Sequence, residues 1–330
     1  MERSRPSART DPHRLVLAIE GGGMRGVVSA GMAAGLESLG LRDVFDAVYG
    51  SSAGAINGAY FVSGQARFGT TIYYENINNR RFIDFLRPLR GRPIADLGFL
   101  VNQVMTNEKI LDWEAVSASP ITLAILATQV GGENRDGRPE IFRNPFSDRQ
   151  ELLDALRASA TLAGAWIGGD PVRVKARAYI DASVTEGIPF DTASREGASH
   201  ILVLRTRHPD KHPRIGLGDR LLIAPQLGRY GPPDGGRLKS TFLTRYERYA
   251  AAVRHLREAE SDRDHFPAAL AVNPTLSVRT FETDYRRLVM GAMDGLRQVL
   301  KVLGLDEPTV SSQLQATSRL GSPTWVDQRS

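Results

Sequence analysis

A serine enclosed by glycines is the residue of this chain best suited to nucleophilic chemistry. Ser52 lies in Gly50-Ser51-Ser52-Ala53-Gly54, between a short apolar run and a stretch rich in small, helix-compatible residues. Gly50 and Gly54 permit a strand-to-helix turn so sharp that larger side chains would collide with the neighbouring elements. Ser52 would then lie at a helix N-terminus, where free N–H groups favour developing negative charge. This pattern alone also fits an ordinary tight turn.

A second glycine-rich turn precedes the first along the chain. It consists of Gly21, Gly22, Gly23, Met24, Arg25 and Gly26. The N–H groups of residues 22 to 24 are predicted to converge on one oxygen, with Arg25 adding a positive charge nearby. Such donors stabilise the oxyanion that forms when a hydroxyl group attacks an acyl carbonyl. The two turns together therefore favour acyl transfer.

The same six residues also match a phosphate-binding loop, which gives an alternative. A Walker-type loop would continue with Lys and Ser or Thr, but Val27 and Val28 follow here. A dinucleotide site would need an acidic residue at the end of the second strand, whereas Asp46 opens that strand. Nucleotide binding is thus the third-ranked hypothesis.

Serine needs a base, and the histidines offer no suitable context. They are His13, His200, His208, His212, His255 and His265, which lie in polar segments, loops or an amphipathic helix. Asp181 is another candidate, because it follows the apolar residues 178–180 and precedes small residues typical of a turn. Its two interpretations are an ordinary turn aspartate and the base of a Ser-Asp pair.

The apolar pattern predicts the elements that position these residues. Residues 15–19, 46–49, 121–128 and 201–204 are expected to be buried strands, separated by helical segments. Residues 152–160 form a predicted helix that is capped by Asp148. This alternation predicts a largely parallel sheet with helices on both faces.

In this order, the two turns and Asp181 resemble the patatin-like phospholipase family. The likeness extends from about Arg14 to Arg207 and includes the Ala-Ser-containing stretch 157–165 and the residues 187–190 after Asp181. The resemblance implies a three-layer α/β/α sandwich. It also implies a Ser-Asp dyad in which Ser52 is the nucleophile, Asp181 the base and residues 21–26 the oxyanion loop. Phospholipids or other acyl esters would be the substrates, and no metal or other cofactor is expected.

One departure from the family pattern supports a different hypothesis. Ala182-Ser183 replaces the glycine-rich pair that usually follows the aspartate, and a proline near Gly164 is also missing. If the turn required a positive φ, Asp181 would be displaced. The chain would then be a catalytically weak lipid-binding protein.

Length and composition are those of an ordinary globular protein. The chain has 330 residues, of which 42% are hydrophobic, and it has no cysteine. Disulfides and a cysteine nucleophile are therefore excluded. No stretch approaches the ~20 apolar residues of a membrane span, and the first residues lack a secretion signal, so a cytoplasmic location is predicted. The net charge of +5 suits either an anionic membrane or a compositional bias; without a recognition motif it does not predict nucleic-acid binding.

The predicted organisation is a single catalytic unit with an extension. Residues 1–13 and 307–330 are expected to be mobile tails, 14–207 the catalytic domain, and 208–306 a helical extension packed on it. The extension carries two apolar stripes, one from Phe242 to Leu256 and one from Leu288 to Leu303. Residues 80–92 mix arginines with apolar side chains and fit either a cap over the domain or a peripheral contact with an anionic membrane.

Overall fold

The computed structural model describes residues 11–131, 137–228, 230, 236–262 and 264–305. The strands are β1 (Leu15–Ile19), β2 (Ala47–Ser51), β3 (Thr122–Val130), β4 (Pro139–Arg143), β5 (Val172–Val174), β6 (Arg177–Ile180), β7 (His200–Leu204) and β8 (Ala268–Val272). The longer helices are α1 (Gly26–Ser38), α2 (Ala53–Val62), α7 (Arg149–Ala160), α10 (Gly236–Leu243), α11 (Arg245–Ser261) and α12 (Tyr285–Val302). The two predicted tails, 1–13 and 307–330, lie outside the described residues except for residues 11–13. The mobility predicted for residues 11–13 stays a prediction.

Shorter helices connect these elements. They are α3 (Ala66–Thr70), α4 (Ile72–Glu75), α5 (Leu97–Phe99), α6 (Trp113–Ala118), α8 (Phe190–Arg195) and α9 (Ala224–Leu227). Further helical turns are η3 (Gly23–Arg25), η4 (Arg42–Val44), η5 (Arg87–Arg90), η6 (Leu100–Glu108), η7 (Ala182–Val184) and η8 (Asp219–Ile223).

The strands form one mostly parallel sheet. Its order is β5-β6-β3-β2-β1-β7-β8, with β4 pairing beside β3. The five strands from β3 to β8 in this order are parallel, whereas β4, β5 and β6 run antiparallel to their neighbours. Ile19 aligns with Gly50 on β2 and with Leu204 on β7. The loops after β1, β2 and β7 therefore lie side by side at the carboxyl ends of these parallel strands.

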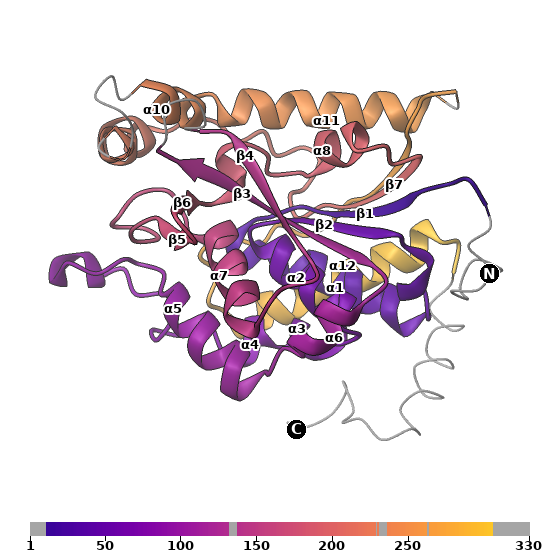
Figure 1. Ribbon diagram of the computed structural model, residues 1–330, viewed down its shortest axis with the longest axis horizontal. Coiled ribbons are helices and arrows are strands. Elements are labelled where there is room, and N and C mark those ends of the chain that lie inside the picture. The colour runs from indigo at the N-terminus through magenta and orange to yellow at the C-terminus, as the bar shows by residue number, and fades with distance from the viewer. Residues whose placement is uncertain (1–10, 132–136, 229, 231–235, 263, 306–330) are drawn as a thin grey trace.

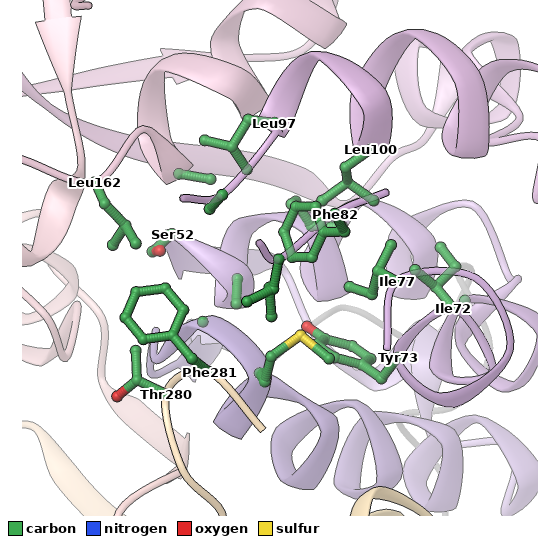
Figure 2. Close-up of a pocket in the computed structure, with 18 residues that line it drawn as sticks. Ser52, Ile72, Tyr73, Ile77, Phe82, Leu97, Leu100, Leu162, Thr280 and Phe281 are labelled. Atoms are coloured by element: carbon green, nitrogen blue, oxygen red, sulfur yellow. The ribbon is translucent and has the colours of Figure 1, made fainter. Parts of the chain in front are cut away.

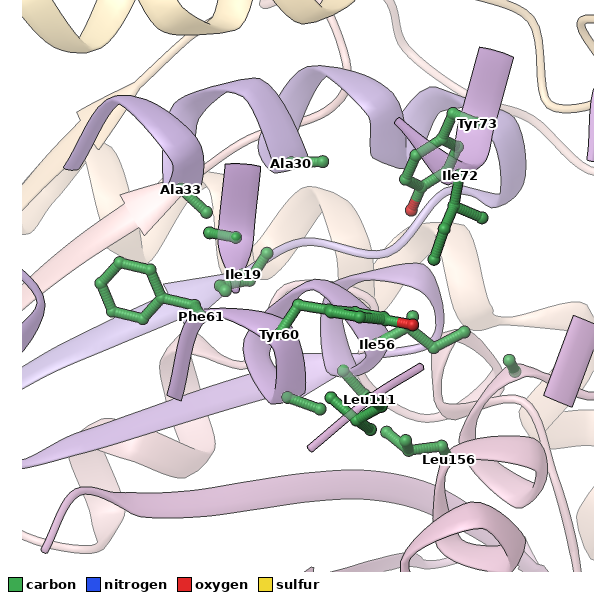
Figure 3. Close-up of a cluster of buried hydrophobic side chains, with 14 of the residues drawn as sticks. Ile19, Ala30, Ala33, Ile56, Tyr60, Phe61, Ile72, Tyr73, Leu111 and Leu156 are labelled. Carbon is green, nitrogen blue, oxygen red and sulfur yellow. The ribbon is translucent and has the colours of Figure 1, made fainter. Parts of the chain in front are cut away.

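Helices cover both faces of the sheet, as the sequence predicted. In Figure 1, α8 and α11 lie on one face, and α1, α2, α7 and α12 on the other. The larger buried cluster fills the second of these faces. Figure 3 shows part of it, with Ile19 from β1, Ala30 and Ala33 from α1, and Phe61 from α2. A second cluster joins the sheet to α8 and α11.

The predicted catalytic-domain elements are found with small shifts of their ends. The strand predicted at 46–49 is β2 at 47–51, and the strand at 121–128 is β3 at 122–130. The Asp148 carboxylate accepts a hydrogen bond from the Glu151 N–H at 2.8 Å, which confirms the cap of α7.

The region after Arg207 differs from its helical prediction in three respects. It contributes a strand, β8, which pairs with β7 at the edge of the sheet. Its first apolar stripe is divided between α10, which carries Phe242, and α11, because the helix breaks at Thr244. On α12, Leu288 and Leu300 of the second stripe are buried, but Leu303 is exposed, and Gly291 and Gly295 are buried against α1.

Candidate active site

Ser52 occupies a strained turn between β2 and α2. Its φ of 56° and ψ of −126° belong to a region that residues other than glycine rarely adopt, typically at a cost of 1–3 kcal/mol. A Cβ on Gly54 would lie under 3.0 Å from the Ile19 carbonyl oxygen, and one on Gly50 equally close to the Ala55 backbone. Glycine is therefore required on both sides of the turn.

Ser52 and Asp181 meet although they are far apart in the sequence. The Ser52 hydroxyl group donates a hydrogen bond to Asp181 Oδ2 at 2.6 Å, and both residues are buried. The other carboxylate oxygen, Oδ1, accepts from the Ser183 N–H at 2.7 Å. Burial raises the pKa of Asp181, and the hydrogen bonds from Ser183 and Ser52 oppose that shift. The carboxylate is thus both oriented and more basic than an ordinary aspartate.

The turn after Asp181 does not require glycine. Ala182 and Ser183 lie in the short helix η7, for which Asp181 is the N-cap. Among the described residues other than glycine, only Ser52 and Lys175 have a positive φ. Alanine and serine therefore fit this turn without strain, and the displacement of Asp181 considered from the sequence does not occur.

The glycine loop after β1 lies beside Ser52, but one predicted donor is already engaged. The Met24 N–H donates to the Thr280 carbonyl oxygen at 3.0 Å, so its expected availability to an oxyanion is wrong. The N–H groups of Gly22 and Gly23 have no partner within the described part of the chain. Ala53 begins α2, so its N–H also lies outside the hydrogen bonds of the helix.

Two pockets of different character meet at Ser52. The first is apolar and lies against α2, α4 and the segment from Ile77 to Leu100. Figure 2 shows Ser52 at one side of it and Ile72 and Ile77 at the other, with Phe82 between. The second pocket, called the polar pocket below, is more polar than the first: it is lined by Asp181, the glycine loop and three arginines. An acyl ester could thus place its chain and its polar part on opposite sides of the serine.

Several residues to which the sequence analysis gave no individual role hold this site in place. Ser159 on α7 accepts the Ser52 N–H at 2.9 Å, and the Ser51 hydroxyl group donates to the Glu186 carbonyl oxygen at 2.7 Å. Arg207 and Thr280 line the polar pocket. Arg207 had a signal in the sequence, because it follows a buried strand and the ends of parallel strands share one edge. Thr280 had none.

The histidines lie elsewhere. All six are described, and none lines either pocket. His255 pairs with Asp191 at 3.1 Å, and His13 contacts the His200 ring. Asp181 is therefore the titratable group in contact with Ser52.

Comparison with known proteins identifies the class. Residues 17–194 match the model of the patatin-like phospholipase family, and this match spans more than half of the chain. The chain belongs to this family of lipid acyl hydrolases, as its resemblance predicted.

The individual proteins that this chain resembles share 30% or less of its sequence in the matched regions. The chain is 30% identical over 200 residues to the uncharacterized protein YjjU of Escherichia coli K12, covering 59% of this chain and 52% of YjjU. It thus spans about half the length of that relative. VipD of Legionella pneumophila covers 89% of this chain and 67% of its own, with 12% identity and a TM-score of 0.46. A chain of the SpcU–ExoU complex from Pseudomonas aeruginosa gives 14% identity and a TM-score of 0.26, covering 94% of this chain and 78% of that chain.

Within the described ranges, none of the helices has both the length and the apolar character needed to cross a bilayer.

Proposed function

We propose that this chain is a serine acyl hydrolase of lipid esters, of the phospholipase A or lysophospholipase type, that works through a Ser-Asp dyad. One observation carries the proposal: the hydroxyl group of a strained, buried serine donates to a buried aspartate at 2.6 Å. Membership of a lipid hydrolase family supports the substrate class. The chemistry requires no metal or organic cofactor.

In the first half-reaction, Ser52 Oγ attacks the acyl carbonyl carbon while Asp181 accepts its proton. The carbonyl oxygen becomes an oxyanion, which the N–H groups of Gly22, Gly23 and Ala53 stabilise at the N-terminal end of α2. The tetrahedral intermediate then collapses. Asp181 returns its proton to the leaving alcohol oxygen, and an acyl-enzyme remains on Ser52.

In the second half-reaction, water attacks the acyl-enzyme and Asp181 accepts a proton from it. When the second tetrahedral intermediate collapses, Asp181 returns this proton to Ser52 Oγ, which restores the hydroxyl group and the carboxylate and releases the fatty acid. Burial favours the neutral form of Asp181, and this assists each proton transfer from oxygen to the carboxylate. The apolar pocket holds the acyl chain during both steps.

Ser52→Ala tests this function. We expect the wild-type protein to release fatty acid from a lysophospholipid, and the variant to be slower by about 10⁴-fold or more, as for other serine nucleophiles. Ser63→Ala, which alters a serine beyond the end of α2, is the matched control and should retain the wild-type rate. Lipid binding by the wild-type protein without any hydrolysis would instead support the lipid-binding hypothesis.

We also propose that the segment 80–92 contacts an anionic membrane beside the apolar pocket. Phe82 and Ile83 line this pocket, whereas Leu86 and Leu89 are 51% and 84% exposed on the same segment. The segment carries η5 and projects at the left of Figure 1, ahead of α5. Arginines are also exposed along it, at positions 80, 81, 90 and 92. Both earlier interpretations of the segment, as a cap and as a membrane contact, are compatible with this arrangement.

The membrane contact predicts a selective loss of activity on vesicles. Leu86→Ser with Leu89→Ser removes apolar surface that would enter the lipid, so vesicle binding should weaken by about tenfold or more. The measurement is the ratio of the rate on anionic vesicles to the rate on a monomeric ester. Leu303→Ser, which changes an exposed leucine at the end of α12, is the control. An unchanged ratio in the double variant would exclude this segment as the contact.

A further inference from the structure

The polar pocket beside Ser52 contains two arginines that form no ion pair with a described carboxylate. Arg25 and Arg207 both line it. Their Nε atoms are buried and have no hydrogen-bond partner among the described residues. The Arg25 guanidinium donates to Thr280 Oγ1, and the Arg207 guanidinium lies over the Tyr249 ring at 5.3 Å. Neither arginine forms an ion pair with a described carboxylate.

The carboxylates that line this pocket are committed to other partners. Glu20 accepts from the Thr206 N–H and from the Tyr249 hydroxyl group, each at 2.8 Å, and lies 3.7 Å from Arg205. Asp219 pairs with Arg245 at 2.8 Å. Asp181 is hydrogen-bonded to Ser52. Neither guanidinium group therefore forms an ion pair with a carboxylate of the pocket, although Glu20 attracts Arg25 from nearby.

Burial lowers the pKa of Arg25, and repulsion from Arg207 lowers it further, while attraction to Glu20 opposes the shift only in part. Two half-buried cations whose Nε atoms are buried and unpaired are costly to hold side by side unless an anion joins them. Guanidinium groups bind phosphate oxygens through paired N–H donors, so a phosphate is the anion they fit best.

The aromatic residues of the pocket point to a second property. A quaternary ammonium group is usually bound by open aromatic faces. Here Arg245 lies over the rings of Phe242 and Tyr246, at 3.8 and 4.2 Å from their centroids, and Arg207 covers Tyr249. Three of the four aromatic rings that line the pocket are thus already covered by cations. A choline group would meet positive charge instead of an aromatic cage.

From these contacts we infer that the polar pocket selects phospholipids whose headgroup is net negative, such as phosphatidylglycerol, over those that carry a quaternary ammonium, such as phosphatidylcholine. Arg207 is the residue that sets this preference, with Arg25 and Arg245 completing the positive wall. The inference rests on the proposed function, because it assumes that the ester of the lipid lies at Ser52.

Binding can be measured without hydrolysis in the full-length Ser52→Ala protein. The ligands are phosphatidylglycerol and phosphatidylcholine with identical octanoyl chains, kept below their critical micelle concentrations so that no charged surface contributes. We expect phosphatidylglycerol to bind at least tenfold more tightly. Adding Arg207→Gln should weaken its binding by about 10- to 100-fold, as for a lost charge-assisted hydrogen bond, and bring the two affinities within about threefold. Arg257→Gln removes the same charge from an exposed site on α11 and should leave the preference intact.

Equal affinities for the two lipids, or a preference that survives Arg207→Gln, would overturn the inference. Inorganic phosphate binding as tightly as phosphatidylglycerol would also overturn it, because the site would then serve a free anion. The proposed function is tested separately by hydrolysis with the wild-type protein. A headgroup preference without hydrolysis would contradict the proposed hydrolase function but support the inferred selectivity. Hydrolysis without the preference would support the function and contradict the selectivity.

Discussion

Asp181→Asn is expected to lower kcat by about 10³-fold or more on any acyl ester. Asparagine keeps the shape of the side chain but cannot accept the proton of Ser52, and a positioned base typically contributes 10²–10⁴-fold. The dependence of kcat/KM on pH should also differ between the wild-type protein and the variant. Because burial raises the pKa of Asp181, protonation of the base should reduce the wild-type kcat/KM at pH values above the ordinary aspartate pKa of 3.8. The variant should lack this acidic limb.

The fold should survive this substitution. A carboxyl group whose pKa is raised by folding disfavours the folded state once it is ionised, so replacing it by a neutral amide costs no stability from this source at pH 7. Asp191→Asn, at the aspartate paired with His255 outside both pockets, is the matched control and should keep the wild-type rate. Activity of Asp181→Asn within tenfold of wild type would mean that another group is the base, and the search would return to the histidines.

Gly295→Val is expected to lower the free energy of unfolding by about 3 kcal/mol, the upper end for overpacking in a buried contact. A Cβ at Gly295 on α12 would lie under 3.0 Å from the Val28 carbonyl oxygen on α1. Helix α1 begins directly after the glycine loop, so separating the two helices should also disturb the loop and reduce activity. Urea unfolding measures the stability change.

Gly35→Ala provides the opposite control on the same helix pair. A Cβ there would lie 3.6 Å from Val299, an ordinary contact, and alanine is favoured over glycine inside a helix by about 1 kcal/mol. This variant should be as stable as wild type or slightly more so. If residues 14–207 and 208–306 form one folding unit, as we propose, Gly295→Val should shift a single cooperative transition. A stability within 1 kcal/mol of wild type would argue against close α1–α12 packing.

The features that were predictable from the sequence are local ones. The strand at 15–19 is a continuous apolar run, and the Ser52 turn combines an apolar strand with glycines at fixed spacing. Each pattern reports on residues adjacent in the chain. The parallel sheet followed from the alternation of such runs with helical segments, and the family resemblance placed Asp181 with Ser52.

Contacts between distant segments were not predictable in this way. The bond from Met24 to the Thr280 carbonyl oxygen removes a donor that the glycine spacing offered, and no pattern at residue 280 signals it. The buried face of α12 was predicted only in part, because close packing against α1 also requires glycine, whereas an apolar count favours leucine. The net charge of +5 indicates by itself only an anionic membrane or a compositional bias. The fold gives Arg207 a specific place beside the serine.

The most direct test of the account is the intact mass of the folded protein after exposure to a fluorophosphonate probe. We predict that the wild-type protein gains the mass of one phosphonyl group, and that Ser52→Ala gains none. Labelling of Ser52→Ala at the wild-type rate, or no labelling of the folded wild-type protein, would contradict the claim that Ser52 is an activated nucleophile.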